Sequence, residues 1–257
     1  MESGEGIPNL EVKKDAKPHE LITHHLGLEF KSPPKGIPMH FVNRLRYWKE
    51  GKLLKASNSS GQYNHSKNEY YFRPKKNSES NFRTTLHESM HALYDQTNPT
   101  IGNVCNTAQA LAGEVSMSML FAMYDKNLID DSVFKFGTDL KTIVQNMNKT
   151  YGVVSEGIAE WGTFEVLGLM KGLRGDDLMA QHLGIISSSE QVRSSSPTVG
   201  KYIDGHSFVS NAMFALQTLG VSRGEALLRL MLNPPKYSQD LEKGGVEYAA
   251  QELMVYS

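Results

Sequence analysis

The segment His87-Glu88-Ser89-Met90-His91 limits what this chain can fold into more than any other stretch. On an α-helix, a step of four residues returns to within about 40° of its starting direction, so His87 and His91 share one face. Their imidazoles can approach one metal ion, and Zn²⁺ accepts neutral imidazole nitrogens at about 2.0–2.1 Å. Glu88 lies beside them, where its carboxylate can accept a proton from water that the metal activates. The segment therefore predicts a zinc-binding helix with Glu88 as a general base.

The residues on either side of this segment also favour a helix. Ser78 or Ser80 can cap its start, and Asn98-Pro99 ends it. Four apolar residues recur between these limits at steps of four, four and three, which predicts a buried face: Phe82, Leu86, Met90 and Leu93. The two histidines lie at the flank of this face, where they are partly sheltered and still reachable.

Composition argues against several classes of function. The 27 basic and 28 acidic residues among 257 give a formal net charge of −1, which predicts neither a nucleic-acid-binding surface nor a membrane-binding patch. Cys105 is the only cysteine, so an internal disulfide is excluded and a reducing compartment is favoured. The first six residues lack a signal-peptide pattern, and no apolar stretch is long enough to span a bilayer. We expect a soluble, cytoplasmic protein with one large domain or two lobes.

The chain before the histidine segment is expected to hold a loosely structured N-terminal arm and a small sheet. Four prolines punctuate residues 1–36 and favour extended backbone there. Apolar residues alternate within 37–54, and the aromatic segment Glu69–Arg73 is closed by a proline, so both are predicted as strands. We expect these strands to form a small antiparallel sheet ahead of the metal helix.

The sequence after Pro99 has a helical pattern. Apolar spacing predicts a buried helix over 107–124, an amphipathic helix over 133–147 that ends near Tyr151-Gly152, and a helix that Ser155 caps. Further helices are expected over 202–219, 223–232 and 246–254. The predicted fold class is therefore α+β and predominantly helical. Residues 37–171 would form the subdomain with the metal helix, and residues 172–257 a helical C-terminal subdomain.

A catalytic zinc ion usually has three protein ligands and one open position, so a third ligand is needed. Glu156 and Glu160 lie four residues apart and share one face of the predicted helix. Glu156 would bind zinc, and Glu160 would hydrogen-bond the second nitrogen of a ligand histidine. Glu114 is the rival ligand, because a carboxylate in an otherwise apolar helix needs a partner or a metal.

Two segments together resemble the gluzincin clan of zinc metallopeptidases: His87–His91 and Ser155-Glu156-Gly157-Ile158-Ala159-Glu160-Trp161. The resemblance implies a zincin-like fold, with Glu156 as the third zinc ligand and Glu160 as the acidic residue beside a ligand histidine. The separation of 65 residues (156 − 91 = 65) is longer than in thermolysin-like or aminopeptidase-like members. Neprilysin-like members tolerate longer insertions. This departure leaves Glu114 open as the alternative.

The same resemblance calls for a tyrosine or histidine that donates to the oxyanion of the reaction, and Tyr202 and His206 are the two candidates. We expect a Zn²⁺-dependent peptidase that acts on a peptide or protein substrate, with no nucleic-acid or membrane partner. The strand Glu69–Arg73 would be the edge strand that aligns an extended substrate. Two other classes stay open: a zincin-like metal-binding scaffold without turnover, and a zinc hydrolase for small-molecule amides or esters.

Overall fold

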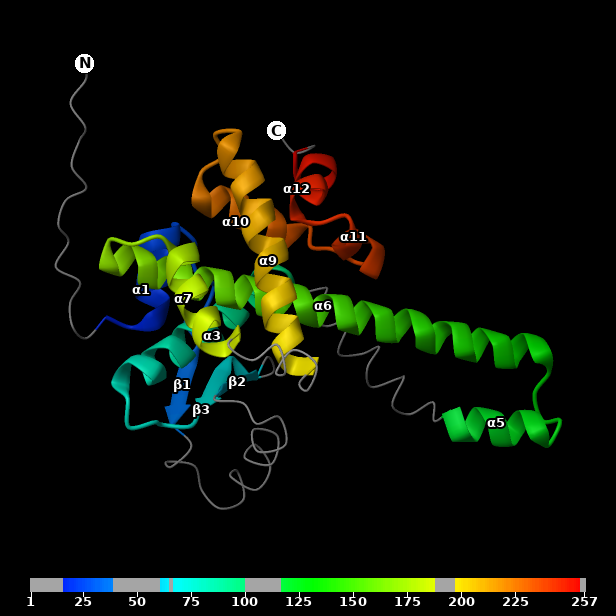
Figure 1. Cartoon of the computed structure of the whole chain (residues 1–257). Helices are drawn as coiled ribbons and strands as arrows, with labels where there is room; N and C mark the ends of the chain where they lie inside the picture. The colour runs from blue at the N-terminus through cyan, green and yellow to red at the C-terminus, as the bar shows by residue number, and fades with distance from the viewer. Residues whose placement is uncertain (1–15, 39–60, 65–66, 100–116, 188–196, 255–257) are drawn as a thin grey trace.

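The computed structural model describes residues 16–38, 61–64, 67–99, 117–187 and 197–254. These residues form helices and three short strands (Figure 1). In chain order the elements are α1 (Pro18–Leu26), β1 (Lys35–Pro38), β2 (Gly61–Asn64), β3 (Glu69–Phe72), α3 (Ser78–Thr97), α5 (Met117–Asp125), α6 (Asp131–Lys171), α7 (Gly175–Ser187), α9 (Pro197–Thr218), α10 (Arg223–Leu232), α11 (Ser238–Glu242), α12 (Gly245–Tyr248) and a π-helical turn, Ala249–Leu253. The predicted α+β class with predominant helix is confirmed at this level.

Helix α3 forms where the sequence predicted it. Its cap is Asn77, whose side-chain oxygen accepts hydrogen bonds from the backbone N–H groups of Glu79 and Ser80 at 2.9 and 3.4 Å. The predicted caps Ser78 and Ser80 instead lie within the first turn. Three of the four predicted core residues, Leu86, Met90 and Leu93, are buried, and Phe82 packs against them partly buried. The helix therefore holds its histidine segment against the core.

The sheet is mixed, so the prediction of an antiparallel sheet was wrong for one strand pair. The strand order is β1-β3-β2, in which β1 is parallel and β2 antiparallel to β3. A short connection between β2 and β3 favours antiparallel pairing, whereas the longer segment after β1 permits a parallel return. Because β3 is paired on both sides, the expected substrate-aligning role of Glu69–Arg73 as an edge strand was also wrong. The part of the predicted strand over 39–54 lies outside the described residues.

The N-terminal region differs from the loosely structured arm that its prolines predicted. Pro18 occupies the first turn of α1, a position that needs no N–H donor. Leu21, Ile22 and Leu26 from this helix are buried in the core. The helix ends at Gly27, whose φ of 68° suits glycine. Residues 16–38 are thus built into the fold, while 1–15 lie outside the described residues.

Helix α6 runs unbroken where the sequence predicted two helices. Asp130 caps it by accepting a hydrogen bond from the backbone N–H of Val133 at 2.9 Å, and it ends at Gly172 with a φ of 66°. Tyr151-Gly152 does not end a helix, and Ser155 is an interior residue instead of a cap. Apolar residues continue directly after Gly152, where Val153 and Val154 are buried. Their burial outweighs the small loss of stability that a glycine causes inside a helix. One continuous helix therefore includes both segments that the sequence predicted as separate helices.

The helix predicted over 107–124 is described only from Met117, and the side chains that are described, from Leu120 onward, are not buried as expected. In α5, Phe121 is 49% and Tyr124 36% exposed. The predicted helices over 202–219 and 223–232 are confirmed as α9 and α10. The segment predicted over 246–254 is divided between α12 and the π-helical turn. No helix in the described part of the chain is long and apolar enough to cross a membrane.

One hydrophobic core joins α1, α3, α6, α9 and α10. Helices α6 and α9 cross at two glycines: a Cβ on Gly157 would collide with the backbone carbonyl of Gly205. This close approach brings the start of α9 against the middle of α6, and α3 packs on α6 as well. All three expected segments contribute to this core, and their division into subdomains stays a prediction.

Candidate metal centre

Three side chains from two helices converge on one point. Helix α3 supplies His87 and His91, and α6 supplies Glu156. The Nε2 atoms of the two histidines are 3.1 Å apart. Glu156 Oε2 lies 3.2 Å from Nε2 of His87 and 3.4 Å from Nε2 of His91. The two segments that were far apart in the sequence thus meet as predicted.

The spacing of these three atoms fits a metal ion. Ligands at about 2.0–2.1 Å in a tetrahedron are about 3.3–3.4 Å from one another. The three measured separations lie at or just below this value. Two imidazole nitrogens and one carboxylate oxygen also form a donor set of the kind that catalytic zinc sites use. The three side chains could therefore hold a metal ion, and their spacing fits the ligand distances of zinc.

The outer nitrogens of both histidines face oxygen atoms of α6: one makes a hydrogen bond and the other a longer contact with a carboxylate. Nδ1 of His91 lies 2.9 Å from Oγ of Ser155, and Nδ1 of His87 lies 3.5 Å from Oε1 of Glu160. A proton held on each Nδ1 leaves the Nε2 lone pairs directed at the shared point. The position predicted for Glu160 is consistent with its expected role. Ser155 was predicted only as a cap, and its place directly before Glu156 was the signal that could have revealed this contact.

Glu88 is buried beside the histidines, with 5% of its surface exposed. Its carboxylate accepts a hydrogen bond from the backbone N–H of Tyr63 in β2. A Cβ on Gly61 would lie 2.5 Å from Oε1 of Glu88, so β2 closes over the carboxylate. Burial raises the pKa of Glu88, although the charges of His87 and His91 oppose the rise. A raised pKa suits a group that must accept and return a proton near neutral pH.

The two candidate oxyanion donors have different surroundings. Tyr202 lies with its ring centroid 5.9 Å from that of His87, and its hydroxyl is hydrogen-bonded to Glu156. Burial and the nearby carboxylates raise the pKa of Tyr202, so the hydroxyl keeps its proton and can donate it in a hydrogen bond. His206 is buried on α9. Burial lowers its pKa, and the charge of Asp176 on α7 opposes this shift. The described contacts of Tyr202 therefore include two of the metal ligands, His87 and Glu156, whereas the carboxylate described near His206 is Asp176.

The charges of the three metal-site side chains strongly affect one another's pKa. Burial lowers the pKa of His87, but its hydrogen bond to Glu156 and the surrounding carboxylates outweigh burial and raise it to about 9. Burial likewise acts to raise the pKa of Glu156, yet the two histidines bring it well below its usual range. Glu156 is therefore ionised and His87 carries a proton at neutral pH. A cation at the shared point would replace that proton.

The rival ligand Glu114 lies outside the described residues, so the structure does not compare it with Glu156. Comparisons of the chain with protein-family models, with curated proteins and with solved structures found no match.

Proposed function

We propose that this protein is a zinc-dependent peptidase of zincin-like fold. The observation that carries the proposal is the convergence of His87, His91 and Glu156 on one point, with Glu88 buried beside them. The order of a strand pair, a histidine helix and a glutamate helix supports the zincin-like assignment and the resemblance to gluzincins. Bound zinc would supply a Lewis acid that polarises a peptide carbonyl and lowers the pKa of water towards neutrality.

The chain's own residues supply the remaining steps. Glu88 accepts the proton of the attacking water and passes it to the amine that leaves. Its burial and the hydrogen bond from Tyr63 hold the carboxylate in a single orientation for both transfers. Tyr202 donates a hydrogen bond to the developing oxyanion, which is worth a few kcal/mol in comparable sites. Ser155 and Glu160 keep the histidine rings in place while this happens.

The intact base is the feature that favours an enzyme over a metal-binding scaffold. A structural zinc site is closed by four ligands and needs no buried carboxylate beside it. Burying Glu88 without a function would cost stability, because a carboxylate loses its hydration in the interior. Peptides are the proposed substrates, since the resemblance to gluzincins concerns peptidases.

The decisive variant is Glu88→Gln, which keeps the shape of the side chain and removes the base. We expect peptide hydrolysis to fall by about 10²–10⁴-fold while zinc content stays at one ion per chain. Glu79→Gln is the matched control, because Glu79 lies in the same helix with its side chain 65% exposed. Hydrolysis would be measured on a mixture of unstructured peptides by mass spectrometry.

Each outcome of this experiment decides between the classes. Full activity in Glu88→Gln would reject the assigned base. A wild-type protein that binds zinc but cleaves no peptide in the mixture would reject the peptidase proposal and favour a scaffold or a small-molecule hydrolase.

A further inference from the structure

Helix α3 meets the sheet along a face that Glu88 shares with two later residues. Glu88, Ala92 and Asp95 are separated by steps of four and three residues, so they lie on one side of the helix. Ala92 is fully buried in a small cluster with Tyr63 of β2 and Tyr70 of β3. The proposed base therefore lies at one end of the contact between α3 and the sheet, and Asp95 lies about two turns away at the other end.

Tyr63 makes polar contacts at both ends of this surface. Its backbone N–H donates a hydrogen bond to the carboxylate of Glu88. Its hydroxyl donates to Oδ1 of Asn68 at 3.0 Å and lies 3.5 Å from Oδ2 of Asp95. Burial and the negative charge of Asp95 raise the pKa of Tyr63, so the hydroxyl keeps its proton and acts as a donor. One residue thus holds the base with its main chain and contacts the far end of the surface with its side chain.

The acceptor of the Tyr63 hydroxyl is itself held in place from two directions. The side-chain amide of Asn68 donates to the backbone carbonyl of Ser32 at 3.0 Å, and its Oδ1 also accepts from Nε2 of Gln96 at 3.1 Å. Gln96 lies near the end of α3 and bonds Ser32 as well, through Nε2 at 2.8 Å and Oε1 at 3.1 Å. The hydroxyl is therefore bonded to a group that is fixed relative to α3.

The position of β2 determines how much room the Glu88 carboxylate has. Strand β2 has four residues and lies at the edge of the sheet, with β3 as its strand partner among the described residues. So short a strand pair is marginal by itself, and packing on a helix has to fix its place. A Cβ on Gly61 would lie 2.5 Å from Oε1 of Glu88, so this backbone already touches the carboxylate. Movement of β2 towards α3 would push the carboxylate aside, and movement away would break its hydrogen bond from Tyr63.

We propose that the Tyr63 hydroxyl anchors β2 to α3 and thereby fixes the Glu88 carboxylate beside the metal ligands, which makes Tyr63 a positioning residue for the base. The hydroxyl acts through β2 and Glu88 and takes no part in a proton transfer. The effect on catalysis rests on the proposed function, whereas the anchor itself does not. The test therefore has one readout that depends on activity and one that does not.

The variant Tyr63→Phe removes the hydroxyl and keeps the ring that packs on Tyr70 and Ala92. Misplacement of a catalytic group by 1 Å can cost about 10²-fold, and a strand that stays paired should move less, so we expect kcat for peptide hydrolysis to fall about tenfold. KM and the zinc content should stay unchanged, because the substrate and the three metal ligands do not contact the hydroxyl in this arrangement. Far-ultraviolet circular dichroism would verify that the variant keeps its helix content.

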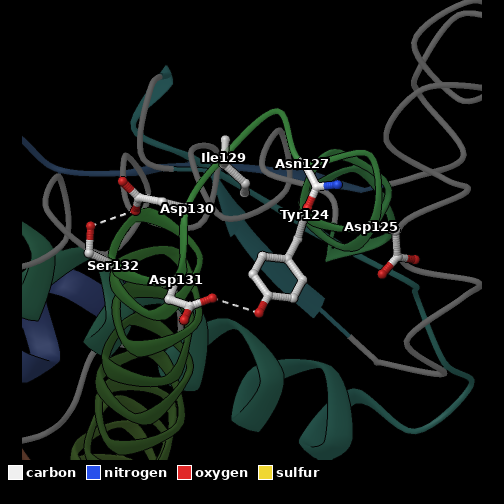
Figure 2. A pocket seen from close by; sticks show the side chains of 7 residues that line it. All are labelled: Tyr124, Asp125, Asn127, Ile129, Asp130, Asp131 and Ser132. Carbon is white, nitrogen blue, oxygen red and sulfur yellow. Dashed lines mark hydrogen bonds between the residues drawn. The ribbon is translucent and has the colours of Figure 1, made fainter.

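Tyr124→Phe is the matched control, because it removes a hydrogen-bonded tyrosine hydroxyl outside the site. Figure 2 shows the Tyr124 hydroxyl at the turn between α5 and α6, where it donates to Oδ1 of Asp131 at 2.6 Å. This variant should keep the kcat, the KM and the zinc content of the wild type. A general effect of losing a tyrosine hydroxyl would appear in both variants, and an effect of the anchor only in Tyr63→Phe.

Hydrogen exchange at the backbone amide of residue 63 tests the anchor without any substrate. Nuclear magnetic resonance of the ¹⁵N-labelled full chain would measure it, because this amide exchanges only when its bond to Glu88 opens. We expect exchange about fivefold faster or more in Tyr63→Phe, and the wild-type rate in Tyr124→Phe.

The two readouts separate failure of this inference from failure of the proposed function. Unchanged exchange in Tyr63→Phe would overturn the anchor, and faster exchange with an unchanged kcat would overturn the positioning role. A raised KM with an unchanged kcat, or loss of zinc, would also overturn it. A wild type that cleaves no peptide would reject the proposed function alone, and the exchange rates would then decide whether the hydroxyl holds β2 against Glu88.

Discussion

The two halves of α6 have the same helical periodicity and opposite surroundings. In the half from 150 to 171, Val154 and Ile158 are fully buried against α3 and α9. In the half from 131 to 149, Phe136 and Ile143 are more than half exposed. Both metal-site glutamates of α6 belong to the buried half.

This contrast shows what burial adds to a sequence pattern. Carboxylates in the buried half must find partners, because an unpaired buried charge is costly. Glu156 and Glu160 find them in the histidines of α3. Asp139, on the exposed half, is solvated and has no such requirement. Chemistry is therefore concentrated in the half where packing fixes the positions of polar atoms.

The largest expected difference between the halves is in stability. Ile158→Ala should lower the free energy of unfolding by about 2–5 kcal/mol, since it leaves a cavity in a packed core. Ile143→Ala makes the same chemical change on the exposed half and should alter it by less than about 0.5 kcal/mol. Urea denaturation of the two variants checks this prediction. Equal effects would contradict the description of the two halves.

Glycine substitutions sharpen the comparison. Gly157→Ala should destabilise the protein by about 1–3 kcal/mol, because the new Cβ meets the rigid backbone of Gly205. Gly137→Ala should be neutral or stabilise by up to about 1 kcal/mol, since alanine favours helix and its contact is the flexible side chain of Leu120. Thermal unfolding would show whether each substitution raises or lowers the stability of the protein. A stable Gly157→Ala protein would argue against the close crossing of α6 and α9.

Ser155 provides a subtler test of the buried half. Ser155→Ala removes the acceptor for Nδ1 of His91 and should weaken zinc binding by about 10–100-fold. Ser155→Thr retains a hydroxyl and should recover most of the affinity. Ser132→Ala, on the exposed half, should have no effect on zinc. Calorimetric titration with zinc measures all three, and unchanged affinity in Ser155→Ala would remove this residue from the site.

The pKa of His87 predicts how pH acts on the metal-free protein and on zinc binding. Its pKa is raised from 6.5 to about 9, so the protonated form stabilises the fold fully below pH 6.5. That contribution is lost as pH rises through 9. Zinc needs the neutral ring, so binding at pH 7 should release a proton from His87. Titrations in buffers of different ionisation enthalpy measure this release, and its absence would contradict the raised pKa.

The sequence predicted local features well because their signals are local. The helix around His87 follows from spacing within single turns. Glu156 was predicted from the need for a third ligand and from the resemblance to gluzincins, and the packing of α3 on α6 is what brings it to the histidines. Tertiary structure decided the rest. The continuity of α6 through Gly152 depends on burial of its stripe, and the parallel pairing of β1 depends on a distant connection. The choice between Tyr202 and His206 depends on how α9 is placed on α6.

Zinc content measured on three proteins tests the central claim most directly. Elemental analysis after dialysis should find one zinc ion per chain in the wild type, one in Asp139→Asn on the exposed half of α6, and none in Glu156→Gln. Zinc absent from the wild type, or retained at full affinity by Glu156→Gln, would contradict the account. Zinc lost from Glu114→Gln but kept by Glu156→Gln would transfer the third ligand to the rival glutamate.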